Sequence, residues 1–191
     1  MTASPVDVQR LSPDLMQDFL SFFDGEAFAD NPKWGSCFCQ FLYVDHAKVN
    51  WEARTLQENR AAACDRICTN RMQGYLAYRD GKPIGWCSAA PRTMIDAFAD
   101  EPDPDASRIG QITCFVVARP HRHSGVATTL LQAACAGLKA QGLEIAEASP
   151  RAQAANDAQH YHGPLSMYIA AGFQVHRTGN NGTVYVRRRL L

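Results

Sequence analysis

The stretch 112–127, ITCFVVARPHRHSGVA, decides the fold of this chain. Its apolar first half predicts a buried β-strand, and Pro120 and Gly125 mark a short basic turn before a helix. A helix begins with unpaired backbone N–H groups and a partial positive charge, so this order of elements creates an anion site. Phosphate is the usual guest of such a site. We therefore expect the turn to bind a phosphorylated cofactor.

The residues of the turn suit a diphosphate. Small residues at Gly125 and Ala127 let the backbone approach the phosphates closely. Arg122 and His123 can donate charge-assisted hydrogen bonds, and Ser124 can donate its hydroxyl or cap the helix. The turn has neither the Lys-Ser/Thr ending of a phosphate loop nor the three glycines of a dinucleotide fingerprint, so ATP, GTP and NAD are poor candidates.

Two blocks of the sequence resemble motifs of one family. Residues 122–127, RHSGVA, match the pattern Arg/Gln-x-x-Gly-x-Gly/Ala behind a strand. This is similar to the acetyl-CoA pyrophosphate motif of the GNAT superfamily of N-acyltransferases. Residues 167–173, MYIAAGF, resemble the Tyr-x-x-x-Gly-Phe motif of the same family. The blocks are separated by one helix and one strand, which also suits the family, and the resemblance extends over residues 74–190.

Length and composition fit one globular domain covering residues 1–191. Hydrophobic residues make up 46% of the chain and charged residues 20%, which is enough to bury a core. The 19 Lys and Arg residues balance 19 Asp and Glu residues, so we expect no nucleic-acid partner. The N-terminus lacks a signal-peptide core, the longest apolar run is too short to span a bilayer, and the seven cysteines form no disulfide framework. We therefore expect a cytoplasmic protein without a membrane partner.

Periodicity and turn residues predict an α+β chain with the order β-α-α-β-β-β-α-β-α-β-β. We expect strands at 5–11, 74–79, 84–89, 109–118, 143–148, 173–177 and 183–189. We expect helices that begin at Ser12 and that cover 51–72, 126–141 and 165–171. The resemblance implies an α/β/α layered fold. It has a mixed, mostly antiparallel sheet of about seven strands, splayed between the fourth and fifth, and about four helices.

The resemblance also implies the cofactor, which is acetyl-CoA as co-substrate, with no metal. In this family the pantetheine arm lies in the splay and pairs with the backbone of the fourth strand. The resemblance thus places Val116 and Val117 beside pantetheine through main-chain groups. The expected cofactor site consists of the end of that strand and the turn behind it: Val116, Val117, Arg122, His123, Ser124, Gly125, Val126, Ala127 and Thr128.

Amide formation from a thioester needs aligned reactants, a donor for the oxyanion and a proton for the leaving thiolate. By resemblance, Tyr168 is the proton donor, which is a general-acid role. Its alternative is a tyrosine that packs under the sheet. The backbone N–H of Val117 is the oxyanion donor, again by resemblance.

The sequence departs from the family at two points. Many members carry an asparagine seven positions before the motif tyrosine, where this chain has Tyr161, with Asn156 five residues earlier. We do not assign that contact. The fourth strand also lacks a carboxylate to serve as general base. A chain of water molecules is one alternative, and the others are the side chains of His162, Glu147 and Glu26.

The acceptor pocket is expected in two segments, the loop 31–41 after the first helix and the segment after the strand that holds Trp86. The loop is rich in Trp, Phe and Cys. Trp34 and Phe38 are candidate contacts, although a loop pinned to the core by its aromatics is an equally good interpretation. Arg92 could pair with a carboxylate of the acceptor. The sequence does not identify this acceptor beyond a small-molecule or peptide amine.

The leading hypothesis is an N-acetyltransferase that moves an acetyl group from acetyl-CoA to a primary amine by direct attack in a ternary complex. The alternative is a non-catalytic acyl-CoA-binding regulatory module. A third hypothesis is a metal-stabilised or thiol protein built on Cys37-x-Cys39 and Cys64-x-x-x-Cys68. A homodimer is compatible with the leading hypothesis, because dimers are common in the family.

Overall fold

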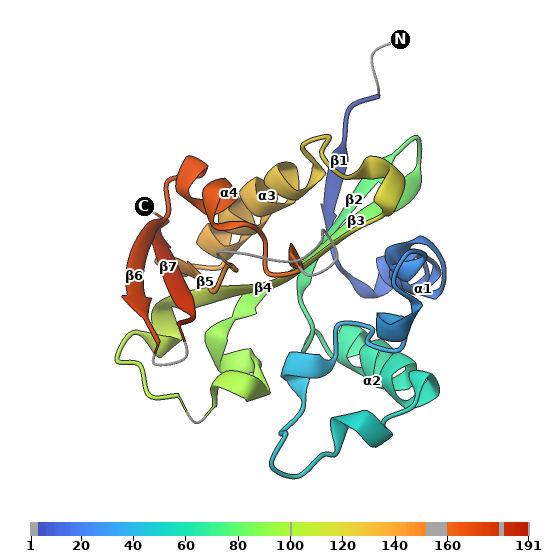
Figure 1. Ribbon diagram of the computed structural model, residues 1–191, viewed down its shortest axis with the longest axis horizontal. Helices are drawn as coiled ribbons and strands as arrows, with labels where there is room; N and C mark the ends of the chain where they lie inside the picture. The colour runs from blue at the N-terminus through green and yellow to red at the C-terminus, as the bar shows by residue number, and fades with distance from the viewer. Residues whose placement is uncertain (1–3, 100, 152–159, 180–181, 191) are drawn as a thin grey trace.

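The computed structural model describes residues 4–99, 101–151, 160–179 and 182–190. Its strands are β1 Asp7–Arg10, β2 Gly74–Arg79, β3 Lys82–Pro91, β4 Ile109–Val117, β5 Ile145–Ala148, β6 Gln174–Thr178 and β7 Val184–Arg189. They form one seven-stranded sheet in the order β1-β2-β3-β4-β5-β7-β6 (Figure 1). β4 and β5 pair in parallel, and the other neighbours pair antiparallel.

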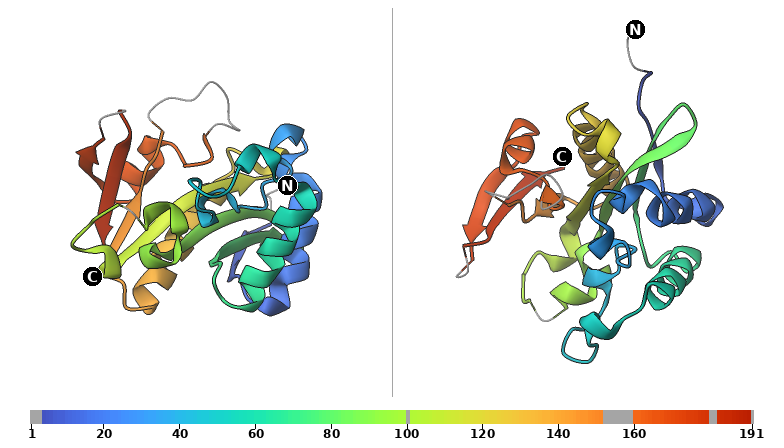
Figure 2. Two further views of the ribbon diagram at one scale, coloured as in Figure 1. Left: turned by 90° about the horizontal axis from the view of Figure 1, so that it is seen from below. Right: turned by 45° about the vertical axis from the view of Figure 1, so that its right-hand side comes forward.

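The helices are α1 Met16–Asp24, α2 Leu56–Cys68, α3 Val126–Ala140 and α4 Leu165–Ala170. Two hydrophobic cores fill the layers between them and the sheet, one with α1 and α2 and the other with α3 and α4 (Figure 2). Phe19 and Trp86 lie in the first core, and Leu130 and Phe173 in the second. The predicted mixed, layered α+β fold is confirmed. None of the helices in the described ranges has the length and apolar character that a bilayer crossing demands.

The first two helices begin later than their sequence patterns predict. The second was expected from Trp51, but α2 begins at Leu56, because Thr55 and Glu58 form a capping box. The hydroxyl of Thr55 accepts from the backbone N–H of Glu58 at 3.2 Å, and the Glu58 carboxylate accepts from the backbone N–H of Thr55 at 2.7 Å. The first was expected from Ser12, whose side chain makes no capping hydrogen bond.

The splay between the fourth and fifth strands is present. β4 pairs with β5 from Ile109 to Ile112 and then continues to Val117 beyond the end of β5. On its other side β4 stays paired with β3 up to Val117, with a register shift near Thr113. The far half of β4 therefore turns one edge toward an opening in the sheet.

Candidate active site

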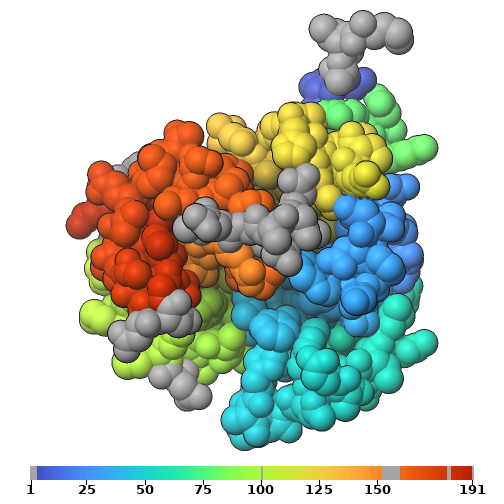
Figure 3. Space-filling model, in the orientation of Figure 1, coloured from blue at the N-terminus to red at the C-terminus, as the bar shows by residue number. Residues whose placement is uncertain are grey.

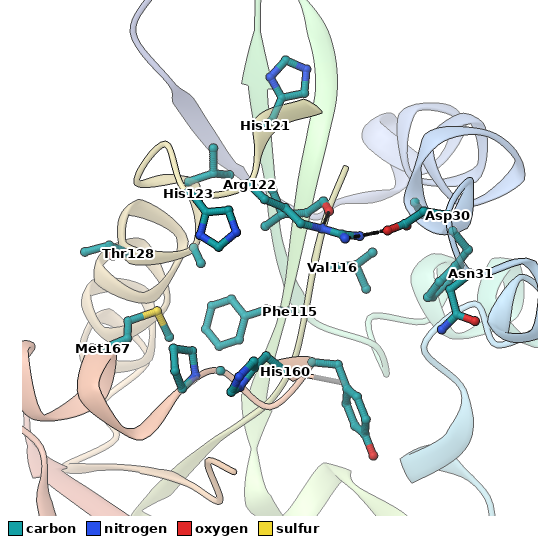
Figure 4. A pocket seen from close by; sticks show the side chains of 18 of the residues that line it. Asp30, Asn31, Phe115, Val116, His121, Arg122, His123, Thr128, His160 and Met167 are labelled. Carbon is teal, nitrogen blue, oxygen red and sulfur yellow. Dashed lines mark hydrogen bonds and ion pairs between the residues drawn. The ribbon is translucent and has the colours of Figure 1, made fainter. Parts of the chain in front are cut away.

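A cavity of about 270 Å³ lies at this opening, between the end of β4, the start of α3, the loop after α1 and the segment before α4 (Figure 4). Eight of the nine expected cofactor residues line it: Val116, Val117, Arg122, His123, Gly125, Val126, Ala127 and Thr128. Ser124 is the exception, because it lies outside the lining and its hydroxyl donates to the carbonyl of His121 at 2.7 Å. We call this space the cofactor cavity.

The positive end of α3 faces the cofactor cavity. Gly125 is the N-cap of α3 with φ +83°, a left-handed conformation that favours glycine. A Cβ atom at Gly125 would meet nothing within 4 Å, so open space lies in front of the helix start. The N–H groups of a first helical turn have no partners within the helix. The site can therefore hold an anion against this end of α3.

Arg122 makes contacts that the sequence did not reveal. Its guanidinium donates to both carboxylate oxygens of Asp30, at 2.6 and 2.9 Å, and to the carbonyl of Val117 at 3.0 Å (Figure 4). The hydrogen bond from Arg122 lowers the pKa of Asp30. Arg122 thus joins the end of β4 to the loop after α1, and its charge is already paired. No local signal marks Asp30, because it lies 92 positions away in the sequence.

The backbone of β4 offers alternate residues to the opening. The N–H of Phe115 donates to the carbonyl of Tyr161 at 2.6 Å, whereas the N–H of Ala118 donates to Ile84 of β3 at 3.0 Å. Main-chain groups alternate sides along a strand. Phe115 and Val117 therefore face the opening, and Val116 faces β3. The main chain of Val116 was expected to lie beside pantetheine, but it faces β3. Val116 lines the cavity through its side chain.

Tyr168 is not brought into the cofactor cavity. Its side chain is fully buried, and its hydroxyl donates to the carbonyl of His162 at 2.9 Å. The ring packs edge-on against Phe173, with 5.2 Å between the ring centroids. Burial raises the pKa of Tyr168 well above its ordinary value. A proton transfer from this phenol would require a rearrangement that frees it from His162.

A second cavity, of about 310 Å³, adjoins the first, and we call it the acceptor cavity. The two share the walls formed by Phe28, Trp34, Val116 and Tyr161. The Trp34 and Tyr161 rings meet edge to face, with 5.3 Å between their centroids. The rest of the lining is largely apolar or sulfur-bearing: Lys33, Ser36, Cys37, Cys39, Phe41, Leu42, Trp51, Thr113, Cys114 and His162.

Of the expected acceptor contacts, the structure brings Trp34 to both cavities, whereas Phe38 and Arg92 lie elsewhere. Phe38 is fully buried and stacks on Phe23 in the core, with 5.7 Å between ring centroids. Arg92 is 2% exposed, and its guanidinium binds the buried carboxylate of Glu147 at 3.1 Å. It also pairs with Glu101 at 3.0 Å. Its positive charge is therefore used within the protein and does not face a substrate.

The alternative general bases occupy different environments. Glu147 is fully buried between Arg92 and Arg187 and lines neither cavity. Glu26 is exposed and is absent from both linings. His162 lines the acceptor cavity. Asn156 lies outside the described residues, and in the described ranges no group of three or more His, Cys, Asp or Glu side chains is arranged to hold a metal ion.

The space-filling view shows where the parts of the chain that supply the site lie on one face of the molecule. The N-terminal helices and loops, blue to cyan, and the C-terminal elements, orange to red, lie on opposite sides of this face (Figure 3). Helix α3, yellow, lies between them at the top of the view. Sequence reasoning did not predict that Asp30, Tyr161, Thr113 and Cys114 line the two cavities. The walls of these cavities come from segments far apart in the chain, so no local pattern marks them. The aromatic and cysteine content of the loop 31–41 was the one signal that pointed to the acceptor cavity.

A sequence model described as the acetyltransferase (GNAT) family matches residues 38–163, more than half of the chain. No curated protein matches. Several solved structures share the fold. The N-acetyltransferase from Staphylococcus aureus Mu50 has a TM-score of 0.60 and 15% identity, over 98% of this chain and 100% of that one. YncA from Salmonella typhimurium, a putative acetyltransferase solved with acetyl-CoA, has a TM-score of 0.58 and 12% identity, over 97% of this chain and 94% of that one. The PaiA N-acetyltransferase from Thermoplasma acidophilum, in complex with coenzyme A, has a TM-score of 0.55 and 13% identity, over 97% of this chain and 99% of that one.

Proposed function

The chain belongs to the GNAT acetyltransferase family, and from this premise we propose that it transfers an acetyl group from acetyl-CoA to a primary amine in a ternary complex. The meeting of the two cavities at the open half of β4 carries the proposal. A thioester held in one cavity and an amine held in the other would be brought together at their shared wall. We take residues 1–191 as one domain, which the single seven-stranded sheet supports. We place the protein in the reducing cytoplasm, which the seven free cysteines support.

The diphosphate of the cofactor is proposed to bind at the start of α3. Gly125 with its open space, and the first residues of α3 that line the cavity, support this position. Pantetheine would then run along β4 beside Phe115 and Val117, whose main chains face the opening. A cofactor group that pairs with the N–H of Phe115 has to take the place of the Tyr161 carbonyl.

In the proposed reaction the amine nitrogen attacks the carbonyl carbon of the thioester. A C–N bond forms, the C–S bond breaks, and the electron pair of that bond goes to sulfur. The N–H of Val117 is our candidate for the oxyanion donor, because it faces the opening. Tyr168 remains the candidate that protonates the thiolate, provided that its hydroxyl leaves the carbonyl of His162.

The alternative, a non-catalytic acyl-CoA-binding module, has an observation in its favour. The phenol of Tyr168 and the N–H of Phe115 are both engaged by the segment before α4. An assay of the full chain with acetyl-CoA and a panel of alkylamines, arylamines and peptides distinguishes the two. Transfer predicts one free thiol for each acetylated amine detected by mass. Tight binding of acetyl-CoA without thiol release from any amine would refute the transferase and favour the module.

A further inference from the structure

His162 occupies the wall of the acceptor cavity in an orientation that leaves one ring nitrogen for chemistry. Its Nδ1 lies 2.9 Å from the carbonyl oxygen of Thr113 on β4. A carbonyl oxygen only accepts hydrogen bonds, so Nδ1 carries the proton and Nε2 keeps its lone pair. The ring of Tyr161 lies against the imidazole, with 4.2 Å between the centroids. The imidazole is thus held on two sides, and it is part of the cavity lining.

The surroundings keep this imidazole neutral. Burial, and to a smaller extent the charge of Arg151, lower its pKa below the ordinary 6.5, against the opposing effect of the Thr113 hydrogen bond. The phenol of Tyr168 contacts the backbone of His162 and not its ring. At neutral pH the side chain of His162 is therefore able to accept a proton.

The other titratable groups of the acceptor cavity are the phenol of Tyr161, one ammonium group and three thiols. Lys33 is the ammonium group, and the thiols are Cys37, Cys39 and Cys114. Burial raises the pKa of Cys37 to about 11. The hydrogen bond between Cys39 and Cys114 lowers the pKa of the former and raises that of the latter. In the described part of the chain, no carboxylate lines this cavity.

This lining discriminates between classes of amine. Phe28, Trp34, Phe41 and Trp51 supply flat apolar walls. An alkylammonium ion would lose its hydration there without a carboxylate to pair with, and it would share the cavity with Lys33. An arylamine is neutral at pH 7, carries a ring that suits these walls, and presents the lone pair that the reaction requires.

We propose that Nε2 of His162 is the general base for the acceptor amine, and that the acceptor is an apolar, weakly basic amine of the arylamine type. This inference rests on the proposed function. When the amine nitrogen forms its bond to the acetyl carbon, its proton passes to Nε2. The C–S electrons stay with sulfur, and the thiolate takes up one proton. The imidazolium then loses its proton to solvent, which leaves the amide, free CoA and a neutral His162.

The test has two readouts on the full chain. Nitrogen-15 NMR of the histidine rings at pH 7.5 should show His162 as the Nδ1–H tautomer, and 4-ethylaniline should shift its Nε2 resonance. Thiol release from acetyl-CoA should be faster with 4-ethylaniline than with 2-phenylethylamine. The rate should fall as pH drops through the lowered pKa of His162, because protonation removes the base.

His162→Gln is the decisive variant, and His176→Gln, on the exposed surface of β6, is its control. We expect His162→Gln to lower kcat about a hundredfold, to leave KM for acetyl-CoA within about twofold and to abolish the acid limb of kcat at saturating amine, where protonation of the free aniline has no effect. The control should match the wild type. An Nε2–H tautomer, a preference for 2-phenylethylamine, or an unchanged rate and acid limb in His162→Gln would overturn the inference while the transferase stands. No thiol release by the wild type from any amine would instead refute the proposed function.

Discussion

Two glycines at opposite ends of α3 provide a matched test of the cofactor site. Gly125 precedes the helix and Gly142 follows it, both with φ +83° and with nothing within 4 Å of an added Cβ atom. A substitution to glutamate therefore introduces the same backbone strain and the same charge at either position. The two variants differ in that Gly125 lines the cofactor cavity and Gly142 does not.

The expected magnitudes follow from electrostatics. A residue with a side chain in the left-handed region costs about 1–2 kcal/mol in either variant. A carboxylate at about 6 Å from a doubly charged diphosphate is repelled by about 1.4 kcal/mol in water, and by about four times as much in a partly enclosed cavity. Gly125→Glu should therefore weaken acetyl-CoA binding by about tenfold to about 10⁴-fold, whereas Gly142→Glu should bind like the wild type.

Folding stability should change in the opposite sense. A negative charge favours the N-terminus of a helix and disfavours its C-terminus by about 0.3–1 kcal/mol. Gly125→Glu should consequently unfold at a higher temperature than Gly142→Glu, although it binds the cofactor less tightly. Calorimetric titration with acetyl-CoA and thermal unfolding measure the two quantities. Equal affinities for the two variants would refute the placement of the diphosphate at this end of α3.

Three further substitutions test other contacts. Tyr168→Phe should lower turnover with little effect on acetyl-CoA affinity, and it should cost about 1 kcal/mol of stability because the partly buried carbonyl of His162 loses its donor; unchanged turnover would remove this phenol from the mechanism. Glu147→Gln should lower the free energy of unfolding by about 1.5–3 kcal/mol in urea, because Arg92 and Arg187 lose the buried carboxylate that they share and keep Glu101 and Asp103 as partners; a loss below about 1 kcal/mol would contradict the importance of this network. Asp30→Asn should raise acetyl-CoA affinity about threefold to about tenfold by calorimetry, because it frees the charge of Arg122 and removes a carboxylate from the cofactor cavity; a weaker complex would show that the ion pair instead holds the site in shape.

The sequence by itself determined the elements and the position of the helix start that faces the cofactor cavity. The stripe Val126, Leu130, Ala134 and Leu138 is buried as its spacing predicts. Asp80 and Gly81 both adopt positive φ in the hairpin between β2 and β3. Such features depend on residues a few positions apart, whose preferences are local. The mixed, mostly antiparallel sheet and its splay came from the family resemblance, and they are present.

Only the tertiary structure decided which side chains reach the two cavities. Phe38 and Cys39 both have positive φ, so the loop 31–41 does not follow the alternation of a strand, and its sequence could not predict that Phe38 turns into the core while Trp34 forms the shared wall. Arg92 was a candidate partner for a carboxylate of the acceptor, but its guanidinium binds the carboxylate of Glu147 on β5. His162 gains its orientation from a carbonyl of β4. Contacts of this kind join segments far apart in the chain, so they depend on how the whole chain packs. At the two cavities this packing is possible because β4 continues beyond the end of β5 and leaves an edge that other segments fill.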